Sequence, residues 1–236
     1  MKPNSAAELA AQFRELGAHI DAGGDPRDSL NRIVVLAQAT ISGADWVAVT
    51  RAGARPKTLA ASDTVARSID DAQIATGEGP CLTAARDGAV TQVPDLTREN
   101  RWPAFRERAA STTPLSALLS FQVESGPPSP AALNLYSAHR DAFDQDAVTT
   151  AALFATHTQV ALMHLHAVDQ STNLRQALTT SRLIGEAVGV LMATRKVTSD
   201  QAFELLRYSS QNLNRKLRDV AVDVTDTGVL PSRDRS

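Results

Sequence analysis

Basic residues gather near the C-terminal end of the chain, where their type and spacing would suit contact with a nucleic acid. They are Arg195, Lys196, Arg207, Arg215, Lys216 and Arg218. From Arg182 to Asp219, seven basic residues stand against four acidic ones, a local excess of three in a chain whose net charge is −2. Cations grouped in this way can replace the counterions of a phosphate backbone. An ordinary solvated helix face, with ion pairs such as Arg215–Asp219, would also account for the pattern.

Uncharged residues in the same segment could recognise bases. Tyr208 could stack on a splayed loop base, and Gln211 could hydrogen-bond to its edge, because RNA loops expose both. Asn214 belongs to the same predicted interface. Tyr208 would serve equally well as a cover for helix packing.

A second group of candidate residues lies in the first half of the chain and could line a site for a small molecule. Cys81 follows the turn Gly77–Pro80, and a thiol at a helix start can have a lowered pKa and act as a redox sensor. A lone cysteine is more often a small buried residue. The apolar candidates Trp102, Phe105 and Leu118 are equally good core residues.

Catalytic and metal-binding patterns are missing from the sequence. It has no Ser-His-Asp order, zinc spacing or P-loop. Asp70 and Asp71 lack the further acidic residues of a phosphoacceptor pocket, and no kinase signature follows His157 or His164, which are one heptad apart. We therefore expect no enzymatic activity, no metal site and no identifiable cofactor.

Length and composition allow one large domain or two small ones. The 236 residues are 43% hydrophobic, which is enough for a buried core. No apolar run is long enough to span a membrane, and the N-terminus lacks the pattern of a signal peptide. Cys81 is the only cysteine, so no internal disulfide can form. A cytoplasmic protein without membrane contact is expected.

The first two thirds of the chain alternate between helical and strand patterns. Such an order suits a mostly antiparallel central sheet with helices packed on it, an α+β domain in which the last two strands are adjacent. Helices are predicted over 8–16, 28–40, 65–76 and 101–110, and strands over 46–50, 57–62, 90–93, 115–123 and 131–136.

Residues 145–194 have a helical pattern without proline. A helix of this length needs a partner for its apolar stripe, so a dimeric helical stalk is expected. The polar stretch 169–173 is the predicted domain boundary, and the sequence leaves open whether the helix breaks there.

Two shorter helices are predicted after the long one, which gives an all-α three-helix C-terminal domain. Thr198 and Gln201 have the spacing of a capping box for a helix from Ser199 to about Ser210. Asn212 or Asn214 would cap the last helix, and Gly228 would end it. The first of these helices is expected to carry Ala202, Phe203, Leu206 and Ser210 on one face, and the second to bury Leu213, Leu217, Val220, Ala221 and Val224.

The C-terminal segment resembles an ANTAR domain, a three-helix RNA-binding module that prevents transcription termination. The resemblance covers about fifty residues and depends on Ala187, Gly189, Leu191, Met192, Ala202, Phe203, Leu206, Ser209, Leu217, Val220 and Ala221. Val188 departs from the pattern, because many members carry lysine there. The helix that contains it therefore has fewer basic residues than in those members.

The front of the chain, residues 10 to 166, resembles the GAF domains that actinobacteria fuse to ANTAR domains. The motifs are GEGPC at 77–81, VPDL at 93–96, RWPAF at 101–105 and LNLYS at 133–137. The proline-rich segment before LNLYS departs from the family pattern. GAF domains bind small molecules or act as dimerising scaffolds, so the resemblance does not supply a ligand.

Together these resemblances imply a sensory transcription antiterminator. The expected organisation is a GAF-like domain at 1–166, a helical linker at 167–180, an ANTAR-like domain at 181–231 and a tail at 232–236. The expected partners are the loops of dual RNA hairpins, a second copy of the chain and an unknown small-molecule effector of the GAF-like domain. Two alternatives remain open: a DNA-binding regulator with a helix-turn-helix-like tail, and a dimerisation scaffold that binds no nucleic acid.

Overall fold

The structure, a computed structural model, describes residues 6–21, 24–88, 90–124 and 130–231. The chain folds into two compact units, residues 1–167 and 168–236. Among the described helices, none is long and apolar enough to cross a membrane.

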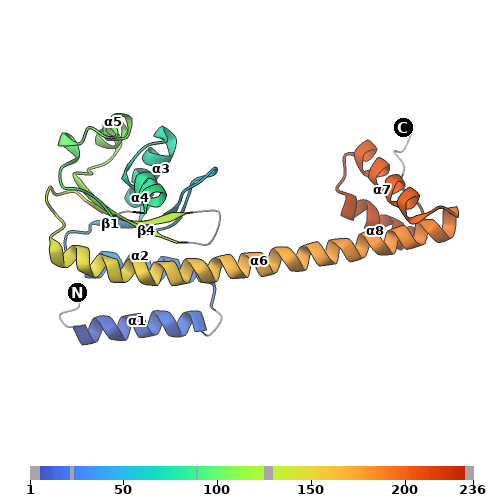
Figure 1. The fold of residues 1–236 in the computed structure, drawn as a ribbon, viewed down its shortest axis with the longest axis horizontal. Coiled ribbons are helices and arrows are strands. Elements are labelled where there is room, and N and C mark those ends of the chain that lie inside the picture. The colour runs from blue at the N-terminus through green and yellow to red at the C-terminus, as the bar shows by residue number, and fades with distance from the viewer. Residues whose placement is uncertain (1–5, 22–23, 89, 125–129, 232–236) are drawn as a thin grey trace. The chain divides into compact units, whose positions relative to one another are not determined.

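The N-terminal unit is built on one antiparallel sheet (Figure 1), as the sequence predicts. The strand order is β2-β1-β5-β4-β3, so the last two strands in the chain lie side by side near its centre. The strands are β1 Trp46–Arg51, β2 Lys57–Ala61, β3 Thr91–Val93, β4 Ala117–Val123 and β5 Ala131–Ser137.

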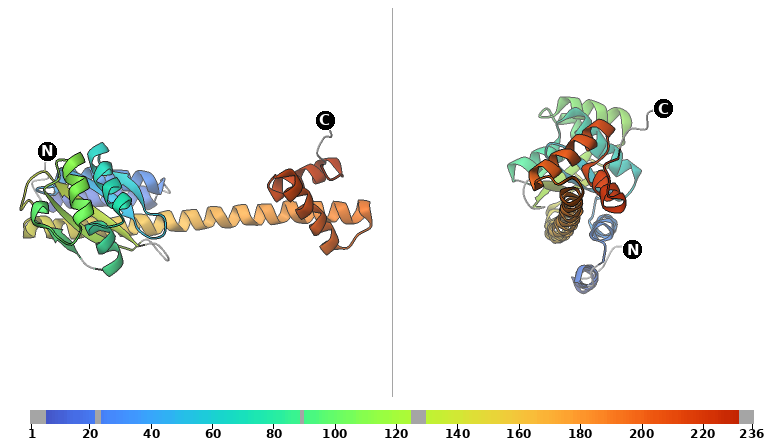
Figure 2. Two further views of the ribbon diagram at one scale, coloured as in Figure 1. Left: turned by 90° about the horizontal axis from the view of Figure 1, so that it is seen from above. Right: turned by 90° about the vertical axis from the view of Figure 1, so that its right-hand side faces the viewer.

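Helices cover both faces of this sheet (Figures 1 and 2). Successive side chains of a strand point to opposite faces, and both faces are buried here. Val49, Leu133 and Leu135 belong to the apolar cluster with α2 and the first part of α6, whereas Leu118 and Tyr136 belong to the cluster with α3 and α5. The helices of this unit are α1 Ala6–Asp21, α2 Pro26–Thr40, α3 Thr64–Thr76, α4 Pro80–Asp87, η1 Leu96–Arg98, α5 Pro103–Thr112 and the start of α6 Gln145–Arg195.

Local sequence signals fix the ends of the helices that flank the sheet. Asp63 caps α3 by accepting a hydrogen bond from the backbone N–H of Ala66 at 2.9 Å. Gly77 ends α3 in the left-handed conformation, and Gly79, with φ 141°, precedes Pro80 at the start of α4. The motif GEGPC therefore forms the tight link between α3 and α4.

Helix α6 is continuous from Gln145 to Arg195. The polar stretch 169–173 does not interrupt it, because it contains neither glycine nor proline and all its residues tolerate a helix. In the N-terminal unit, Phe154, Leu162 and Leu165 of this helix are buried against the sheet. Its last turns, with Ala187 and Leu191, belong to the core of the C-terminal unit.

The C-terminal unit packs the end of α6 against α7 Ser199–Leu213 and α8 Leu217–Thr227. This all-α arrangement confirms the predicted fold class. Thr198 and Gln201 form the predicted capping box, and Gly228 ends α8 with φ 76°. The core holds Ala187, Val188, Leu191, Ala202, Leu206, Val220, Ala221 and Val224.

Two sequence predictions for this unit are wrong. The buried face of α7 contains Ser209, whereas Phe203 is 40% exposed, because a core centred on Ala202 and Leu206 leaves Phe203 at the edge of the helix. Neither predicted asparagine caps α8. Asn214 is the left-handed C-cap of α7, a conformation that asparagine tolerates, and Lys216 precedes α8 without a side-chain cap.

Candidate functional site

The predicted RNA-contacting residues fall into two groups at opposite ends of α7. Arg195 and Lys196 lie at the turn between α6 and α7. The caps of α7, Thr198 and Asn214, are sixteen residues apart, which corresponds to roughly 24 Å along a helix. The second group consists of Arg207, Tyr208 and Gln211 in the C-terminal half of α7, together with Asn214, Arg215, Lys216 and Arg218 in and just after the turn between α7 and α8.

Carboxylates accompany the three arginines of this second group. Arg207 pairs with Glu204 at 2.6 Å, Arg215 with Asp223 at 2.5 Å and Arg218 with Asp219 at 3.1 Å. The sequence had suggested Asp219 as the partner of Arg215. The structure selects Asp223 because Arg215 lies in the turn before α8, where helical i,i+4 spacing does not apply.

These arginine pairs are exposed, so they hold their cations weakly. The arginine side chains are 56%, 42% and 55% accessible in the order given, and solvent-exposed pairs of this kind contribute between 0 and about 1 kcal/mol. A phosphate group can therefore replace the carboxylate at little cost. Among the described residues, Arg195, Lys196 and Lys216 form no ion pair and are exposed.

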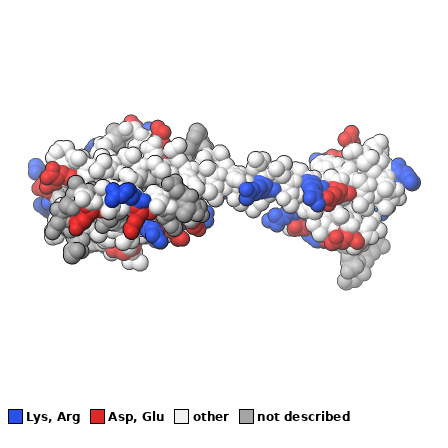
Figure 3. Space-filling view, turned by 90° about the horizontal axis from the view of Figure 1, so that it is seen from below, with Lys and Arg blue, Asp and Glu red and all other residues white. Residues whose placement is uncertain are grey.

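The charge of the outward face of α7 changes from the first half of the helix to the second. Asp200 and Glu204 occupy its first half, and Arg207, Tyr208 and Gln211 its second half. Figure 3 shows that one face of the C-terminal unit carries both positively and negatively charged side chains. The face is therefore suited to phosphate only toward the turn between α7 and α8.

In the N-terminal unit, the candidate ligand-contacting residues are all buried. Trp102, Phe105 and Leu118 pack together between the sheet and the helices α3 and α5. Cys81 lies in a separate apolar cluster with Ala52 of the loop after β1 and with α4. Burial raises the pKa of the Cys81 thiol well above its ordinary value, which disfavours the reactive thiolate that redox sensing needs.

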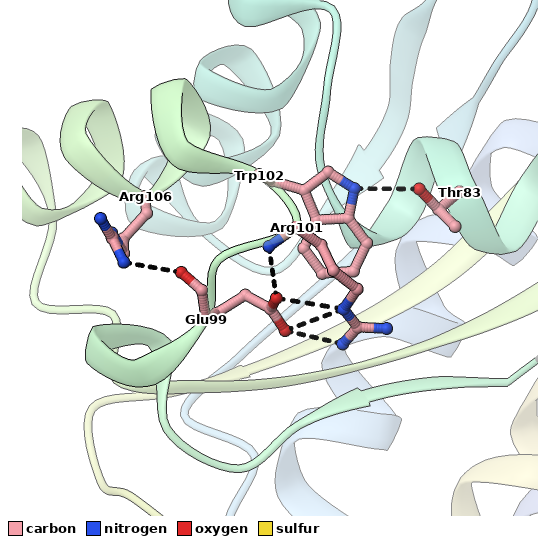
Figure 4. A network of polar contacts seen from close by, with 5 residues as sticks. All are labelled: Thr83, Glu99, Arg101, Trp102 and Arg106. Carbon is pink, nitrogen blue, oxygen red and sulfur yellow. Dashed lines mark hydrogen bonds and ion pairs between the residues drawn. The ribbon is translucent and has the colours of Figure 1, made fainter.

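A polar network fixes the loop that carries Trp102 (Figure 4). The indole N–H of Trp102 donates to Thr83 Oγ1 of α4 at 3.1 Å, and the guanidinium of Arg101 lies 4.3 Å from the indole ring centroid. The carboxylate of Glu99 accepts hydrogen bonds from the guanidinium and from the backbone N–H of Arg101, and its backbone carbonyl accepts one from Arg106 at 2.8 Å. The loop is thus tied to both α4 and α5.

A buried polar cluster next to these residues was not predicted from the sequence. Asp70 of α3 is fully buried and accepts hydrogen bonds from Thr50, from Thr58 at 2.8 Å and from Tyr136 at 2.5 Å. Burial raises the pKa of Asp70, while these donors oppose the shift. The pKa of Tyr136 is raised well above its ordinary value by burial and by the nearby Asp70.

Two buried oxygen atoms beside this cluster have no hydrogen-bond partner among the residues that the structure describes. They are Oδ1 of Asn134 and Oγ of Ser120, two residues that are register partners on the neighbouring strands β5 and β4. Gln73 connects the cluster to Cys81, since its Nε2 donates to Tyr136 OH at 3.0 Å and its Oε1 accepts from the Cys81 backbone N–H at 2.9 Å. One feature of the sequence could have indicated this cluster: the polar residues Asp70 and Gln73 lie on the side of α3 that is otherwise apolar and buried.

Two sequence families match the two units. The profile of the GAF domain family matches residues 25–163, more than half of the chain, and that of the ANTAR domain family matches residues 172–224. The chain is a GAF-ANTAR regulator. ANTAR domains are RNA-binding antitermination modules, and GAF domains are sensory. Among the residues that the structure describes, no group of histidine, cysteine or acidic side chains could hold a metal ion.

Solved structures resemble the GAF-ANTAR chain in fold. The phycoerythrobilin-bound GAF domain of a cyanobacterial phytochrome aligns with a TM-score of 0.51 at 12% identity, covering 67% of this chain and 95% of that one. The GAF domain of an Acinetobacter phosphoenolpyruvate-protein phosphotransferase aligns with a TM-score of 0.51 at 15% identity, covering 70% and 97%. No curated protein matches the chain. At these identities the likeness concerns the fold alone.

Proposed function

We propose that this protein is a sensory transcription antiterminator whose C-terminal unit binds hairpin loops of nascent RNA under the control of the GAF domain. Holding paired hairpins would exclude a terminator from forming. The single observation that carries the proposal is that Arg207, Tyr208, Arg215 and Lys216 are all exposed between the middle of α7 and the start of α8, in a unit that matches the ANTAR family. Exposed cations and an exposed aromatic ring are the groups that bind RNA loops.

The GAF domain would receive the signal as a small molecule of unknown identity. Cys81, Trp102, Phe105 and Leu118 remain the candidate contacts, and the cluster around Asp70 adds polar groups near them. A ligand can shift the regulator only by preferring one of two states of the protein. A cytoplasmic, non-enzymatic role is part of this proposal.

A second copy of the chain is the proposed partner of α6. Leu153, Val160 and Met163 are 48%, 50% and 55% exposed on the side of α6 that faces away from the buried Phe154 and Leu162. Seven-residue steps continue this apolar stripe from Val160 through Ala167 to Leu174, which is 62% exposed. A helix with two apolar faces requires two partners, and a heptad repeat favours a coiled coil.

The dimerisation scaffold that binds no RNA is a second candidate, favoured by the carboxylate partners of Arg207, Arg215 and Arg218. Binding of full-length protein to an RNA with two hairpins, measured by electrophoretic mobility shift, tests both functions. Antitermination predicts a shift at low salt that Arg215→Glu with Lys216→Glu abolishes. A folded wild-type protein that shifts no hairpin RNA would favour the scaffold. Preference for duplex DNA in competition would indicate the DNA-binding alternative.

A further inference from the structure

Tyr208 separates two grooves on the surface of the C-terminal unit. Its side chain is 66% exposed and lines both of them. The first groove has a volume of about 520 Å³ and is lined also by Leu205, Ser209, Asn212, Leu213, Leu230 and Pro231. The second has a volume of about 610 Å³ and is lined also by Val197, Asp200, Gln201, Glu204 and Leu205.

The two grooves differ in charge. The first has no charged residue among its described lining residues, and the cations Arg215 and Lys216 lie in the α7–α8 turn just after Leu213 of that lining. The second is lined by two carboxylates, Asp200 and Glu204, which repel phosphate. The second groove also has cations beside it, since Lys196 precedes Val197, but only the first groove has neighbouring cations and no carboxylate among its described lining residues. The first groove is therefore better suited to a polyanion.

We propose that the first groove, which we call the Asn212 groove, binds one unpaired nucleobase from an RNA hairpin loop, stacked against Tyr208. This inference rests on the proposed function and adds to it the site that would take the base. Leu205, Leu213 and Leu230 supply the apolar surface that a base plane needs. The exposed amide of Asn212 offers both a donor and an acceptor to the base edge.

The wall of this groove is fixed before any ligand binds. Ser209 Oγ donates to the backbone carbonyl of Pro231 at 3.2 Å, which ties the segment after α8 to α7. Leu230 packs against the core of the unit. A pre-formed groove avoids the entropy cost of ordering its walls when a ligand enters.

Arg215 and Lys216 are placed to bind the phosphates next to a base that occupies the groove. Arg215 and Lys216 lie two and three residues after Leu213 in the groove lining. They can bind the phosphates on either side of a base held in the groove, and Arg215 would exchange Asp223 for phosphate. Binding would therefore combine stacking, which is tolerant of base identity, with a polar contact that is not.

The experiment is a fluorescence anisotropy titration of full-length protein with a labelled hairpin RNA and with copies that carry one abasic site at each loop position. We expect one abasic position to weaken binding between about 5- and 150-fold, the range given by loss of one stacked base. In the protein, Tyr208→Ala should weaken the intact hairpin by a similar factor, while Tyr208→Trp should retain binding. The abasic position should have no further effect in Tyr208→Ala, since the two changes remove the same contact.

Asp200→Asn is the matched control, because it alters the second groove without adding bulk or charge. It should bind at least as tightly as the wild type. Asn212→Ala should change which base is preferred at the sensitive position. Circular dichroism checks that each variant is folded, and 2-aminopurine at the sensitive position should lose fluorescence on binding wild type but not Tyr208→Ala.

The outcomes separate this inference from the proposed function. If no hairpin RNA binds, the proposed function fails and the inference fails with it. If the hairpin binds but every abasic copy and Tyr208→Ala bind equally well, the Asn212 groove is not a base site while RNA binding stands. If an apolar peptide competes with the RNA for the groove and abasic RNA does not differ, the groove is a protein-binding site and the inference is overturned.

Discussion

At the scale of single residues, the unusual feature of the N-terminal unit is a carboxyl group buried without a cationic partner among the described residues. Asp70 is surrounded by hydroxyl and amide groups from β1, β2 and β5, which replace the water that it loses. Such groups oppose but do not cancel the cost of burying a charge, so the pKa of Asp70 is raised. The folded protein therefore holds this proton at pH values where the unfolded chain has released it.

Asp70 should make the stability of the N-terminal unit fall as the pH rises. The protonated Asp70 adds to the free energy of unfolding, and this contribution is complete below the pKa of the group in the unfolded chain, about 4. It is lost as the pH rises through the raised pKa of the folded state. Asp70→Asn cannot titrate. The free energy of unfolding of the wild type minus that of the variant should fall by about 1.4 kcal/mol per pH unit between the two pKa values. Urea unfolding followed by tryptophan fluorescence measures it, because Trp46 and Trp102 both lie in this unit. A difference that rises with pH would contradict the prediction.

Gly79 is needed for the link between α3 and α4. Its φ is 141°, and a Cβ atom there would lie 2.7 Å from Cγ of Gln73, whose amide joins Cys81 to Tyr136. Gly79→Ala should destabilise the unit by more than the 1–3 kcal/mol or so of backbone strain alone. Gly53→Ala is the control, because Gly53 has φ 113° with open space around it. Chemical denaturation of both variants compares the costs, and equal losses would show that the clash with Gln73 is unimportant.

Lys216 should contribute to RNA affinity through phosphate contact alone. Its side chain is exposed and forms no ion pair with any described residue. Lys216→Ala should reduce the slope of log K against log salt concentration by about 0.7 to 0.9 and weaken all hairpin sequences alike. Anisotropy titrations at several salt concentrations measure the slope. Arg182→Ala, which removes a cation outside the predicted interface, should leave the slope unchanged, and equal effects of the two variants would speak against the interface.

At the scale of secondary-structure elements, α6 has one apolar face that is buried and a second apolar stripe that is exposed. Its inner face, with Ala151, Phe154 and Leu162, is covered within the N-terminal unit. Helix α1 adds a contact at its flank, where the ring of Phe13 stacks on His157 with centroids 3.9 Å apart. His157 is therefore covered in part from within the same chain.

The outer stripe of α6 should hold two copies together. Val160→Glu combined with Leu174→Glu places charges in the heptad stripe and should convert a dimer into a folded monomer at micromolar concentrations, since buried unpaired charges are costly. Gln176→Glu, on the opposite side of the same helix, should leave the dimer intact. Sedimentation equilibrium measures the mass, and circular dichroism confirms the helix content. A wild-type protein that is monomeric at tens of micromolar would refute the pairing.

At the scale of the whole molecule, the proposed function combines two RNA-binding units through one dimer. Binding of the second hairpin then takes place within a complex that has already formed, which raises affinity without any new contact. An RNA with two suitably spaced hairpins should bind the wild type at least about 100-fold more tightly than one hairpin does. The Val160→Glu, Leu174→Glu variant should lose this advantage but retain single-hairpin affinity. Isothermal titration with both RNAs makes the comparison, and an advantage that survives in the monomeric variant would rule out this use of the dimer.

The sequence by itself determined the order and type of the elements, the α+β and all-α classes of the two units, the capping box at Thr198 and the end of α8 at Gly228. These features depend on local signals, namely hydrophobic periodicity, caps and glycines, which act within a few residues. Only the tertiary structure decided that Asp70 meets Thr50, Thr58 and Tyr136, that Arg215 pairs with Asp223, and that Pro231 shares a groove with Tyr208 and Asn212 of α7. These contacts join residues whose separation in the chain carries no period, because strand order and helix packing, rather than local preference, bring them together.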